Sequence, residues 1–474
     1  MPASHHVHGP GLAHPSTRQQ PARHGVAGHR PDLHPPHRSR AGRRLPVLLG
    51  IAAAAALLAG CASSASSATD GTGTAASASA ASAGAASAGA ASGPLQSGAG
   101  SSAASAGADL FDAKGCIKNY TAGVDYYPDK SEITHATNFT IEYKDSYQVL
   151  TVKQPTQGGS PESYVLVRCG APKPALTGAL SGATLVTTPV TSLYSGSTSH
   201  LGSLVALDQL DALTGVGSKA LISEKQVLDR VAESGVVEYA AAGTIDAEAV
   251  VKGKPQVVIT AGTDDPAYAV ISAAGIPVLA NAEWLENDPL GRAEWVKYFA
   301  ALTGTEATAK TFFDQVSADY TALADKVKNA PKVDVVPGQP YQGTWFVPGG
   351  KSFNARLIQD GGGGTAWAAD TTTGSISTDV ETVFAKAGKA PAWLASTTWT
   401  TKAEALAEEP RFAQFEAFKT GNVWNAAKDV TKLGGNNYYE LGVVRPDLIL
   451  GDLVAILHPD LEPGHEFAFY LKLS

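Results

Sequence analysis

The chain has 474 residues, a length that allows two or three domains, and 44% of them are hydrophobic while 17% are charged. These fractions are typical of a soluble globular protein. The net charge of −8 argues against nucleic acid as a partner, because phosphate binding needs a basic surface.

The N-terminal region has the pattern of an export signal. Two arginines precede a short apolar run over residues 45–58, which is too short for a comfortable membrane span. The following tetrad Leu58-Ala59-Gly60-Cys61 resembles a bacterial lipobox, in which the cysteine is lipidated and becomes the first mature residue. We therefore expect residues 1–60 to be leader and signal peptide, and Cys61 to be the lipid anchor. The alternative is an ordinary buried cysteine after an uncleaved helix.

Residues 61–109 consist almost wholly of Ala, Ser, Gly and Thr. Such a segment buries too little apolar surface to offset the entropy of ordering, so we expect a disordered tether. A lipid anchor with a tether holds a protein at the outer face of the membrane without spanning it. Loss of residues 1–60, with seven Arg and one Asp, makes the mature chain more acidic. A misplaced start codon is an alternative for residues 1–42.

Residues 110–182 are predicted to form a small β-rich N-terminal unit, because β-forming residues recur over 140–143, 147–152 and 164–167. This unit contains Cys116 and Cys169. An exported chain enters an oxidising compartment, so the two cysteines predict a disulfide. Two separate buried thiols are the alternative.

From residue 183 short apolar strands alternate with helical patterns, which indicates a parallel sheet covered by helices. We expect a first α/β lobe over residues 183–304. In open sheets of this kind ligands bind beyond the carboxyl ends of the strands. The predicted strands are 183–187, 256–260 and 276–280, and the predicted helices are 247–252 and 268–274.

Residues 306–328 give the clearest helical pattern, with apolar side chains recurring at steps of three and four. We expect a connecting helix within residues 305–330 and a second α/β lobe over residues 331–474. The fold class is therefore α/β, with two Rossmann-like lobes joined by a single long α-helix and a small β-rich N-terminal extension. In the second lobe we expect strands at 344–347, 392–395 and 466–471, and helices at 353–359, 380–386 and 448–457.

Several stretches, taken in order, resemble the class III substrate-binding proteins of ABC importers, the iron-siderophore and cobalamin group. The resemblance covers roughly residue 183 to the C-terminus, and Gln256 stands where that family usually has Asp. The stretches are residues 245–259, 283–286, 289–295, 434–440 and 445–447.

The resemblance implies a monomeric, lipid-anchored receptor at the outer face of the cell membrane. Its two lobes would close modestly over a ligand and deliver it to an ABC permease and its ATPase. The matching segments place the permease contacts at Glu248 and Glu381, since a carboxylate can pair with an arginine pocket. A solvated helix charge is the alternative at each position.

Candidate ligand-binding residues are aromatic or basic and follow strands or lie in loops. Core packing is the alternative for each aromatic one. The expected ligand is an iron-siderophore, with a corrinoid or a haem-like chelate as further possibilities. The four His outside the leader are scattered, which argues against capture of a bare metal ion, and we expect no metal site and no cofactor. The candidates are Tyr194, Trp284, Arg292, Trp345, Arg356, Trp399 and Tyr439.

No catalytic residues are predicted. The Gly-Gly-Lys-Ser stretch at 349–352 resembles the end of a phosphate loop, but Trp345 stands where that loop needs Gly. The chain also lacks a Gly-x-Ser-x-Gly elbow beside a plausible His and acid. We therefore expect a binding protein rather than an enzyme. A lipid-anchored two-lobed α/β enzyme is the alternative function, and a surface adhesin is a further one.

Overall fold

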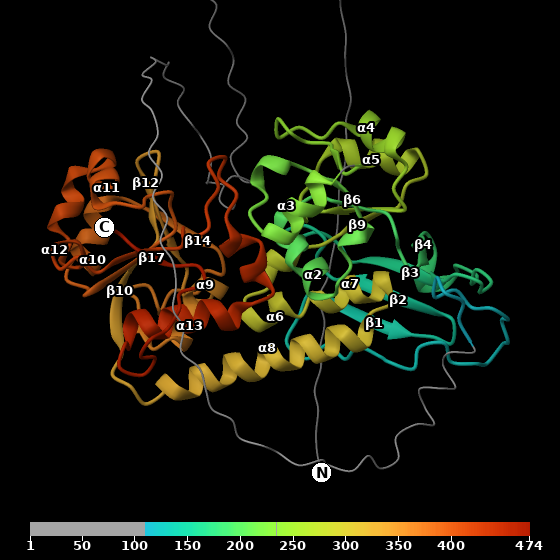
Figure 1. Ribbon diagram of the computed structural model, residues 1–474, viewed down its shortest axis with the longest axis horizontal. Helices are drawn as coiled ribbons and strands as arrows, with labels where there is room; N and C mark the ends of the chain where they lie inside the picture. Colours follow the sequence, from blue (N-terminus) through green and yellow to red (C-terminus); the bar gives the residue numbers. More distant parts are fainter. Residues whose placement is uncertain (1–109, 234) are drawn as a thin grey trace, which may run out of the picture. The chain divides into compact units, whose positions relative to one another are not determined.

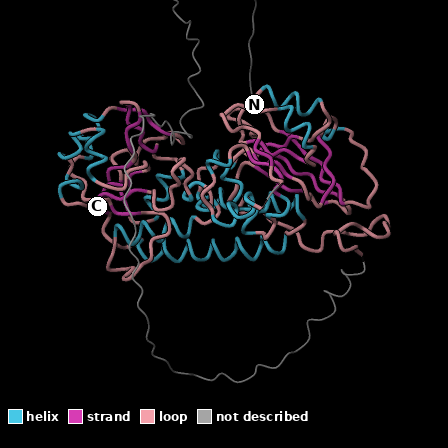
Figure 2. Tube along the Cα trace, turned by 45° about the horizontal axis from the view of Figure 1, so that its top comes forward, coloured by secondary structure: helices cyan, strands magenta, loops and turns pink. Residues whose placement is uncertain are grey.

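The computed structural model describes residues 110–233 and 235–474, which all belong to one structural unit (Figure 1). The predictions for residues 1–109, including the lipid anchor at Cys61, lie outside the described residues. Strands gather in separate sheets, with helices around them (Figure 2). Within the described ranges, no helix is both long and apolar enough to cross a bilayer.

The N-terminal unit is a four-stranded sheet in the order β1-β2-β3-β4. The first three strands pair antiparallel, as the β-rich pattern predicts. The strand expected to open the first α/β lobe forms, but it is β4 of this sheet and runs parallel to β3. The reason is burial, because Val186 of β4 packs into the same core cluster as Leu166 of β3. The bounds are β1 Phe139–Tyr143, β2 Tyr147–Val152, β3 Glu162–Arg168 and β4 Thr184–Thr188.

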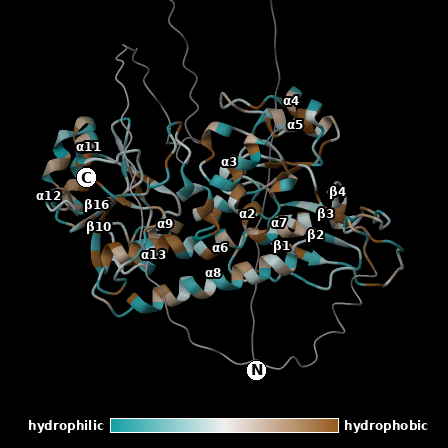
Figure 3. Cartoon of the chain, viewed as in Figure 1, coloured by the Kyte–Doolittle hydropathy of each residue, from teal (hydrophilic) through white to brown (hydrophobic). Residues whose placement is uncertain are grey.

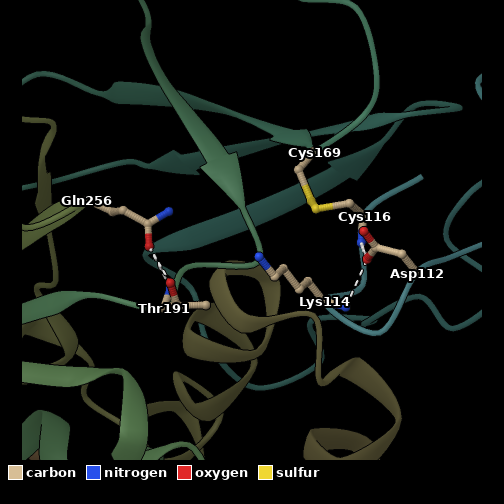
Figure 4. The surroundings of a disulfide bond; sticks show 6 residues. All are labelled: Asp112, Lys114, Cys116, Cys169, Thr191 and Gln256. Carbon is tan, nitrogen blue, oxygen red and sulfur yellow. Dashed lines mark hydrogen bonds between the residues drawn. A yellow bond between two sulfur atoms is a disulfide. The ribbon is translucent and has the colours of Figure 1, made fainter. Parts of the chain in front are cut away.

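The predicted disulfide between Cys116 and Cys169 is confirmed, with 4.7 Å between the two Cα atoms (Figure 4). Near it, Gln256 Oε1 accepts hydrogen bonds from the backbone N–H of Thr191 at 2.7 Å and of Ser192 at 3.0 Å. The side-chain carbonyl of Gln256 therefore supplies an acceptor, as an Asp carboxylate would at this position.

The first lobe contains a five-stranded parallel sheet in the order β7-β6-β5-β8-β9. The predicted strands at 256–260 and 276–280 are confirmed as β8 and β9. The central strand β5 is three residues long, too short for a sequence pattern to reveal. The bounds are β5 Leu193–Ser195, α2 Leu201–Ala206, β6 Leu213–Val216, α3 Lys225–Ala232, β7 Val237–Glu238, α4 Ala247–Gly253, β8 Val257–Thr260, α5 Pro266–Ala273, β9 Val278–Ala280, α6 Pro289–Ala293 and α7 Val296–Thr303.

The long connecting helix is confirmed as α8, Glu306–Val327, one residue shorter than predicted. Its first half meets the first lobe, where the Lys297 ammonium of α7 lies 4.4 Å from the centre of the Phe313 ring. Its second half meets the second lobe, where the Tyr320 hydroxyl donates a 2.8 Å hydrogen bond to Asp360 of α9. One stiff helix therefore packs against both lobes (Figure 1).

The second lobe has a five-stranded sheet in the order β13-β10-β15-β16-β17 and a three-stranded antiparallel sheet, β11-β12-β14. Hydrophobic residues are concentrated along α13, which packs on α8 and α9 (Figure 3). The bounds are β10 Val333–Pro337, β11 Gln339–Tyr341, β12 Thr344–Pro348, α9 Phe353–Asp360, β13 Gly363–Gly364, β14 Ser375–Thr378, α10 Val380–Ala387, β15 Ala392–Ala395, α11 Lys402–Glu408, α12 Glu416–Lys419, β16 Val423–Asn425, α13 Pro446–Leu457 and β17 Leu471–Lys472.

The predicted last strand over residues 466–471 is mostly wrong, because only β17 pairs with β16. The backbone N–H groups of Ala468, Phe469 and Tyr470 donate instead to the buried carboxylate of Asp452, at 2.7–3.0 Å. A strand ladder would need some of these donors, so the carboxylate of α13 replaces the sheet as their partner. The confirmed fold is mixed α/β with parallel sheets in two lobes.

Candidate ligand-binding site

An arginine lies where the two lobes meet. Glu283 follows the carboxyl end of β9, and its Oε2 accepts hydrogen bonds from Nε of Arg292 at 2.7 Å and from Nη2 at 2.6 Å. The Arg292 guanidinium lies 4.1 Å from the centre of the Phe353 ring, which belongs to α9 of the second lobe. A planar cation is thus held between a carboxylate of one lobe and an aromatic face of the other.

Two adjacent tyrosines border the same place. Tyr439 is 44% exposed, and its hydroxyl is hydrogen-bonded to Ser396, which follows the carboxyl end of β15. The ring of Tyr438 meets that of Tyr439 edge-on, with 5.0 Å between centroids. Side chains after strands of both sheets therefore converge on the junction, the position in which open α/β sheets bind ligands.

The space that these groups enclose is small. Arg292, Phe353, Tyr438 and Tyr439 line a pocket of about 10 Å³, which has room for about one water molecule. The other lining residues come from α6, α9, α13 and the segment before α13. A chelate does not fit inside this pocket, although Tyr439 leaves an aromatic surface exposed beside it.

Three predicted ligand-binding aromatics are buried in the cores of their lobes. Tyr194 is part of β5 and stacks on Tyr239 at 5.6 Å between centroids. Trp345 stacks on Trp393 at 5.2 Å in the core of the second lobe. Trp399 is 5% exposed and belongs to that same core. At these positions the structure matches the alternative of core packing.

The remaining two candidates lie in different places. Trp284 is half-buried beside Glu283, and its Nε1 donates a 3.0 Å hydrogen bond to the backbone oxygen of Ala261, just after β8. Arg356 is exposed on α9 and pairs at 2.7 Å with Asp360, which also contacts α8. The structure thus brings Trp284, Arg292 and Tyr439 to strand ends or to the junction, and leaves Arg356 facing solvent elsewhere.

Sequence reasoning missed Glu283, Phe353, Tyr438 and Ser396. Glu283 stands beside a candidate tryptophan, and its spacing from Arg292 gave no sign that the two side chains meet. Phe353 entered only as an apolar residue of a predicted helix. The short polar residue after a predicted strand was the one available signal for Ser396, because strand ends mark the binding edge.

The two predicted permease contacts occupy matching positions. Glu248 and Glu381 are each the second residue of a helix, after the N-cap residues Asp246 and Asp379. Each N-cap carboxylate accepts a hydrogen bond from the backbone N–H three residues on. Both glutamates are exposed, and Glu381 forms an ion pair with Arg411. Each lobe therefore presents a carboxylate from the first turn of a helix, Glu248 from α4 and Glu381 from α10.

One serine and one histidine in the first lobe are hydrogen-bonded in a way that invites comparison with an enzyme. Ser195 Oγ lies 2.9 Å from Nδ1 of His200, and each residue is 1% exposed. Burial lowers the pKa of His200 to about 4, although Glu283 acts in the opposite direction. The pair is inaccessible to a solute. In the described part of the chain, no three His, Cys, Asp or Glu residues are grouped so that they could hold a metal ion.

A family model described as periplasmic binding protein matches residues 194–430, which run from within β5 to just after β16. The chain belongs to this family of solute-binding proteins, which are not enzymes, and the family places it outside the cytoplasm.

Two uncharacterized lipoproteins of Methanocaldococcus jannaschii are similar in sequence. One is 32% identical over 255 residues, which are 53% of this chain and 59% of the relative. The other is 26% identical over 268 residues, which are 54% of this chain and 64% of the relative. The chain thus spans less than two thirds of either relative.

Solved structures with a similar fold include a periplasmic binding protein from Veillonella parvula and a periplasmic heme binding protein from Pseudomonas aeruginosa. The first has a TM-score of 0.48 and 14% identity, and covers 68% of this chain and 98% of its own. The second has a TM-score of 0.47 and 18% identity, and the match covers 60% of this chain and 98% of the heme binding protein.

Proposed function

We propose that this chain is a lipid-anchored receptor that captures a metal chelate outside the cell and delivers it to an ABC permease and its ATPase. An iron-siderophore is the preferred ligand, with a corrinoid or haem-like chelate as related possibilities. Cys61 would carry the lipid, and the receptor would act as a monomer. The observation that carries the proposal is the arginine held between Glu283 of one lobe and Phe353 of the other.

The chemistry of this junction suits a large, partly anionic and partly apolar solute. A guanidinium offers several N–H donors to carboxylate or other anionic oxygens. Aromatic faces such as Tyr439 offer flat apolar contact at low entropic cost. Because the pocket beside Arg292 holds about one water molecule, a chelate would contact the exposed face of Tyr439 and require Phe353 or the lobes to move apart.

Delivery would use the two matching helical glutamates. Glu248 and Glu381 project from helix N-termini, one on each lobe, and suit paired arginine pockets on a permease. The partial positive charge of a helix N-terminus favours a carboxylate there. Charges at such a rim speed encounter more than they tighten binding.

Thermal-shift and calorimetric titration of the full chain against ferric siderophores, corrinoids and haem tests the receptor function. A ligand at 100 times its dissociation constant stabilises the native state by about 2.7 kcal/mol, which a thermal scan resolves. Replacement of Arg292 by Ala should weaken binding of the active chelate at least about tenfold, since a charge-assisted contact is worth 1.4 kcal/mol or more.

Arg356→Ala is the matched control, because Arg356 is an exposed arginine of α9 that pairs with Asp360 and does not line the pocket beside Arg292. It should bind the chelate as the parent does. If none of the three chelate classes raises the unfolding temperature, or if both arginine variants bind as tightly as the parent, the proposed receptor site is wrong.

A further inference from the structure

A buried carboxylate of the second lobe binds the first lobe directly. Glu440 lies between β16 and α13 and is 0% exposed. Its Oε2 accepts three hydrogen bonds, from the backbone N–H of Ser223 at 2.7 Å, the Ser223 hydroxyl at 2.9 Å and the backbone N–H of Glu224 at 3.1 Å. Ser223 and Glu224 precede α3 of the first lobe, and Glu224 is its N-cap.

The surrounding segment, residues 434–441, is fitted closely to the first lobe. We call it the clasp segment. A Cβ atom added to Gly435 would lie 2.7 Å from the backbone oxygen of Leu221, and one added to Gly202 of α2 would lie 2.8 Å from the backbone oxygen of Glu440. Side chains at either glycine would therefore push the two lobes apart. The Asn437 side chain also donates a 3.0 Å hydrogen bond to the Glu224 carboxylate.

The clasp segment also carries the exposed aromatic of the candidate site. Tyr439 directly precedes Glu440, and its hydroxyl bonds to Ser396 of the second lobe. The backbone that presents Tyr439 is therefore fixed on one side by the second lobe and on the other by the first. Breaking the hydrogen bonds between Glu440 and Ser223 removes one of the two attachments of the backbone that presents Tyr439.

We propose that Glu440 is a positioning residue, which joins the two lobes by hydrogen bonds at a point away from α8 and thereby sets how far the junction opens around Tyr439. The inference rests on the proposed function only in taking Tyr439 as part of the ligand site. With the Glu440 bonds intact, relative motion of the lobes is limited at both α8 and the clasp segment. With them broken, the clasp segment keeps only the hydrogen bond from Asn437 to Glu224 and its packing, so it limits that motion less.

The Glu440 bonds are suited to breaking and re-forming. Glu440 Oε2 receives all three bonds, whereas Oε1 is buried and has no hydrogen-bond partner among residues 110–233 and 235–474. No cation is among the groups bonded to Glu440 in the described residues. The Glu224 carboxylate acts on Glu440 as a like charge. A buried oxygen without a partner reduces the net gain from closing the clasp, so opening costs less than it would for a fully bonded carboxylate.

Two measurements on the full chain, made without any ligand, test the inference. Spin labels on Lys252→Cys of α4 and Ala385→Cys of α10, both exposed, report the distance between the lobes by pulsed electron resonance. Hydrogen exchange reports the amides of Ser223 and Glu224. Glu440→Ala should broaden the distance distribution toward longer values and speed exchange of these two amides at least tenfold. Glu440→Gln, which keeps the side-chain size, should show the same changes to a smaller extent.

Glu294→Gln is the matched control, since Glu294 is a buried carboxylate that binds backbone amides of the N-terminal unit and makes no hydrogen bond to the clasp segment among the described residues. It should leave both the distance distribution and the Ser223 and Glu224 amides as in the parent. Unchanged distances in folded Glu440→Gln and Glu440→Ala, or equal changes in Glu294→Gln, would overturn the inference. Because no ligand is used, failure of the clasp leaves the receptor proposal standing, and failure to find a chelate leaves the clasp standing.

Discussion

Two regions of the molecule use buried glutamates to hold distant backbone, but they differ in how completely the carboxylates are bonded. Where the N-terminal unit meets the first lobe, Glu294 accepts from the backbone N–H groups of Thr134, His135 and Ala136 and from the ammonium of Lys297. Glu286 beside it binds the next two residues of the same segment. At the clasp segment, Glu440 has three donors on one oxygen and, in the part of the chain that the structure describes, no bonded cation.

The difference shows in the proton affinity of the two carboxyl groups. For Glu294, burial alone would raise the pKa, but the hydrogen bonds from Lys297, Ala136 and His135 outweigh it, and the pKa is lowered. For Glu440, burial outweighs the bonds from Ser223 and Glu224, and the pKa is raised. The charged form of Glu294 is therefore favoured by its surroundings and that of Glu440 is disfavoured, which agrees with the proposal that the Glu440 contact opens more readily.

Glu294→Ala is expected to have the largest effect and tests the difference between the two attachments most directly. The variant leaves the buried Lys297 without a carboxylate, with only the backbone oxygen of Glu132 as acceptor, and removes the acceptor for three backbone amides. We therefore expect a loss of about 3–5 kcal/mol in the free energy of unfolding. Urea denaturation measures the loss. Glu466→Ala, at an exposed position, should change the free energy of unfolding by less than about 0.5 kcal/mol. A loss below about 1 kcal/mol for Glu294→Ala would contradict the difference between the two attachments.

Much of the fold follows from sequence, because it depends on local periodicity. The steps of three and four apolar residues placed α8 to within one residue, and alternating or continuous β-formers placed β2 and β15. The short strands β5 and β16 escaped, since three residues are too few to show a period. The prediction of two Rossmann-like lobes rests on the alternation of strands and helices, which remains recognisable when a few short strands are not predicted. The domain boundaries and the roles of Glu248 and Glu381 stay predictions.

The site was less predictable, because residue type does not reveal the partner. Glu294 bonds Thr134, 160 positions away, and nothing in the sequence distinguishes it from a solvated helix glutamate. Trp345 and Tyr439 are both aromatic, yet one is a core residue and the other is exposed at the junction. Whether such a side chain is buried or exposed depends on packing between residues far apart in the sequence, which only the tertiary structure shows.

Stability as a function of pH sharpens the comparison, because the two carboxyl groups should act with opposite sign. A lowered pKa means that the contribution of Glu294 is present above about pH 4.5 and is lost as the pH falls through its folded value. A raised pKa means that the contribution of Glu440 is full below about pH 4.5 and is lost as the pH rises through its folded value. Glu224 is the titratable group that faces Glu440 and raises its pKa further.

Urea denaturation of the parent, Glu294→Gln and Glu440→Gln between about pH 3.5 and pH 8 measures these signs. The deficit of Glu294→Gln should grow as the pH rises, and that of Glu440→Gln should shrink, each by at most about 1.4 kcal/mol per pH unit for one proton. Glu224→Gln in the Glu440→Gln background separates the contribution of the second carboxyl. Deficits that change with pH in the same direction would remove the contrast between the two attachments.

The smallest expected effect comes from single hydroxyl groups, one in each attachment. Ser223→Ala removes one of three donors to Glu440, and Thr137→Val removes the hydroxyl that donates at 2.7 Å to Glu286. Each change should cost about 1 kcal/mol in urea denaturation, the net worth of one hydrogen bond. Only Ser223→Ala should also speed exchange of the Glu224 amide, because that amide bonds to the same oxygen of Glu440, and Thr137 lies in the other attachment.

Ser272→Ala, at an exposed serine of α5, should change neither the free energy of unfolding nor the exchange of the Glu224 amide. If Thr137→Val sped up exchange of the Glu224 amide as much as Ser223→Ala does, both regions would open together as one unit. The clasp segment would then open no more readily than the rest of the first lobe.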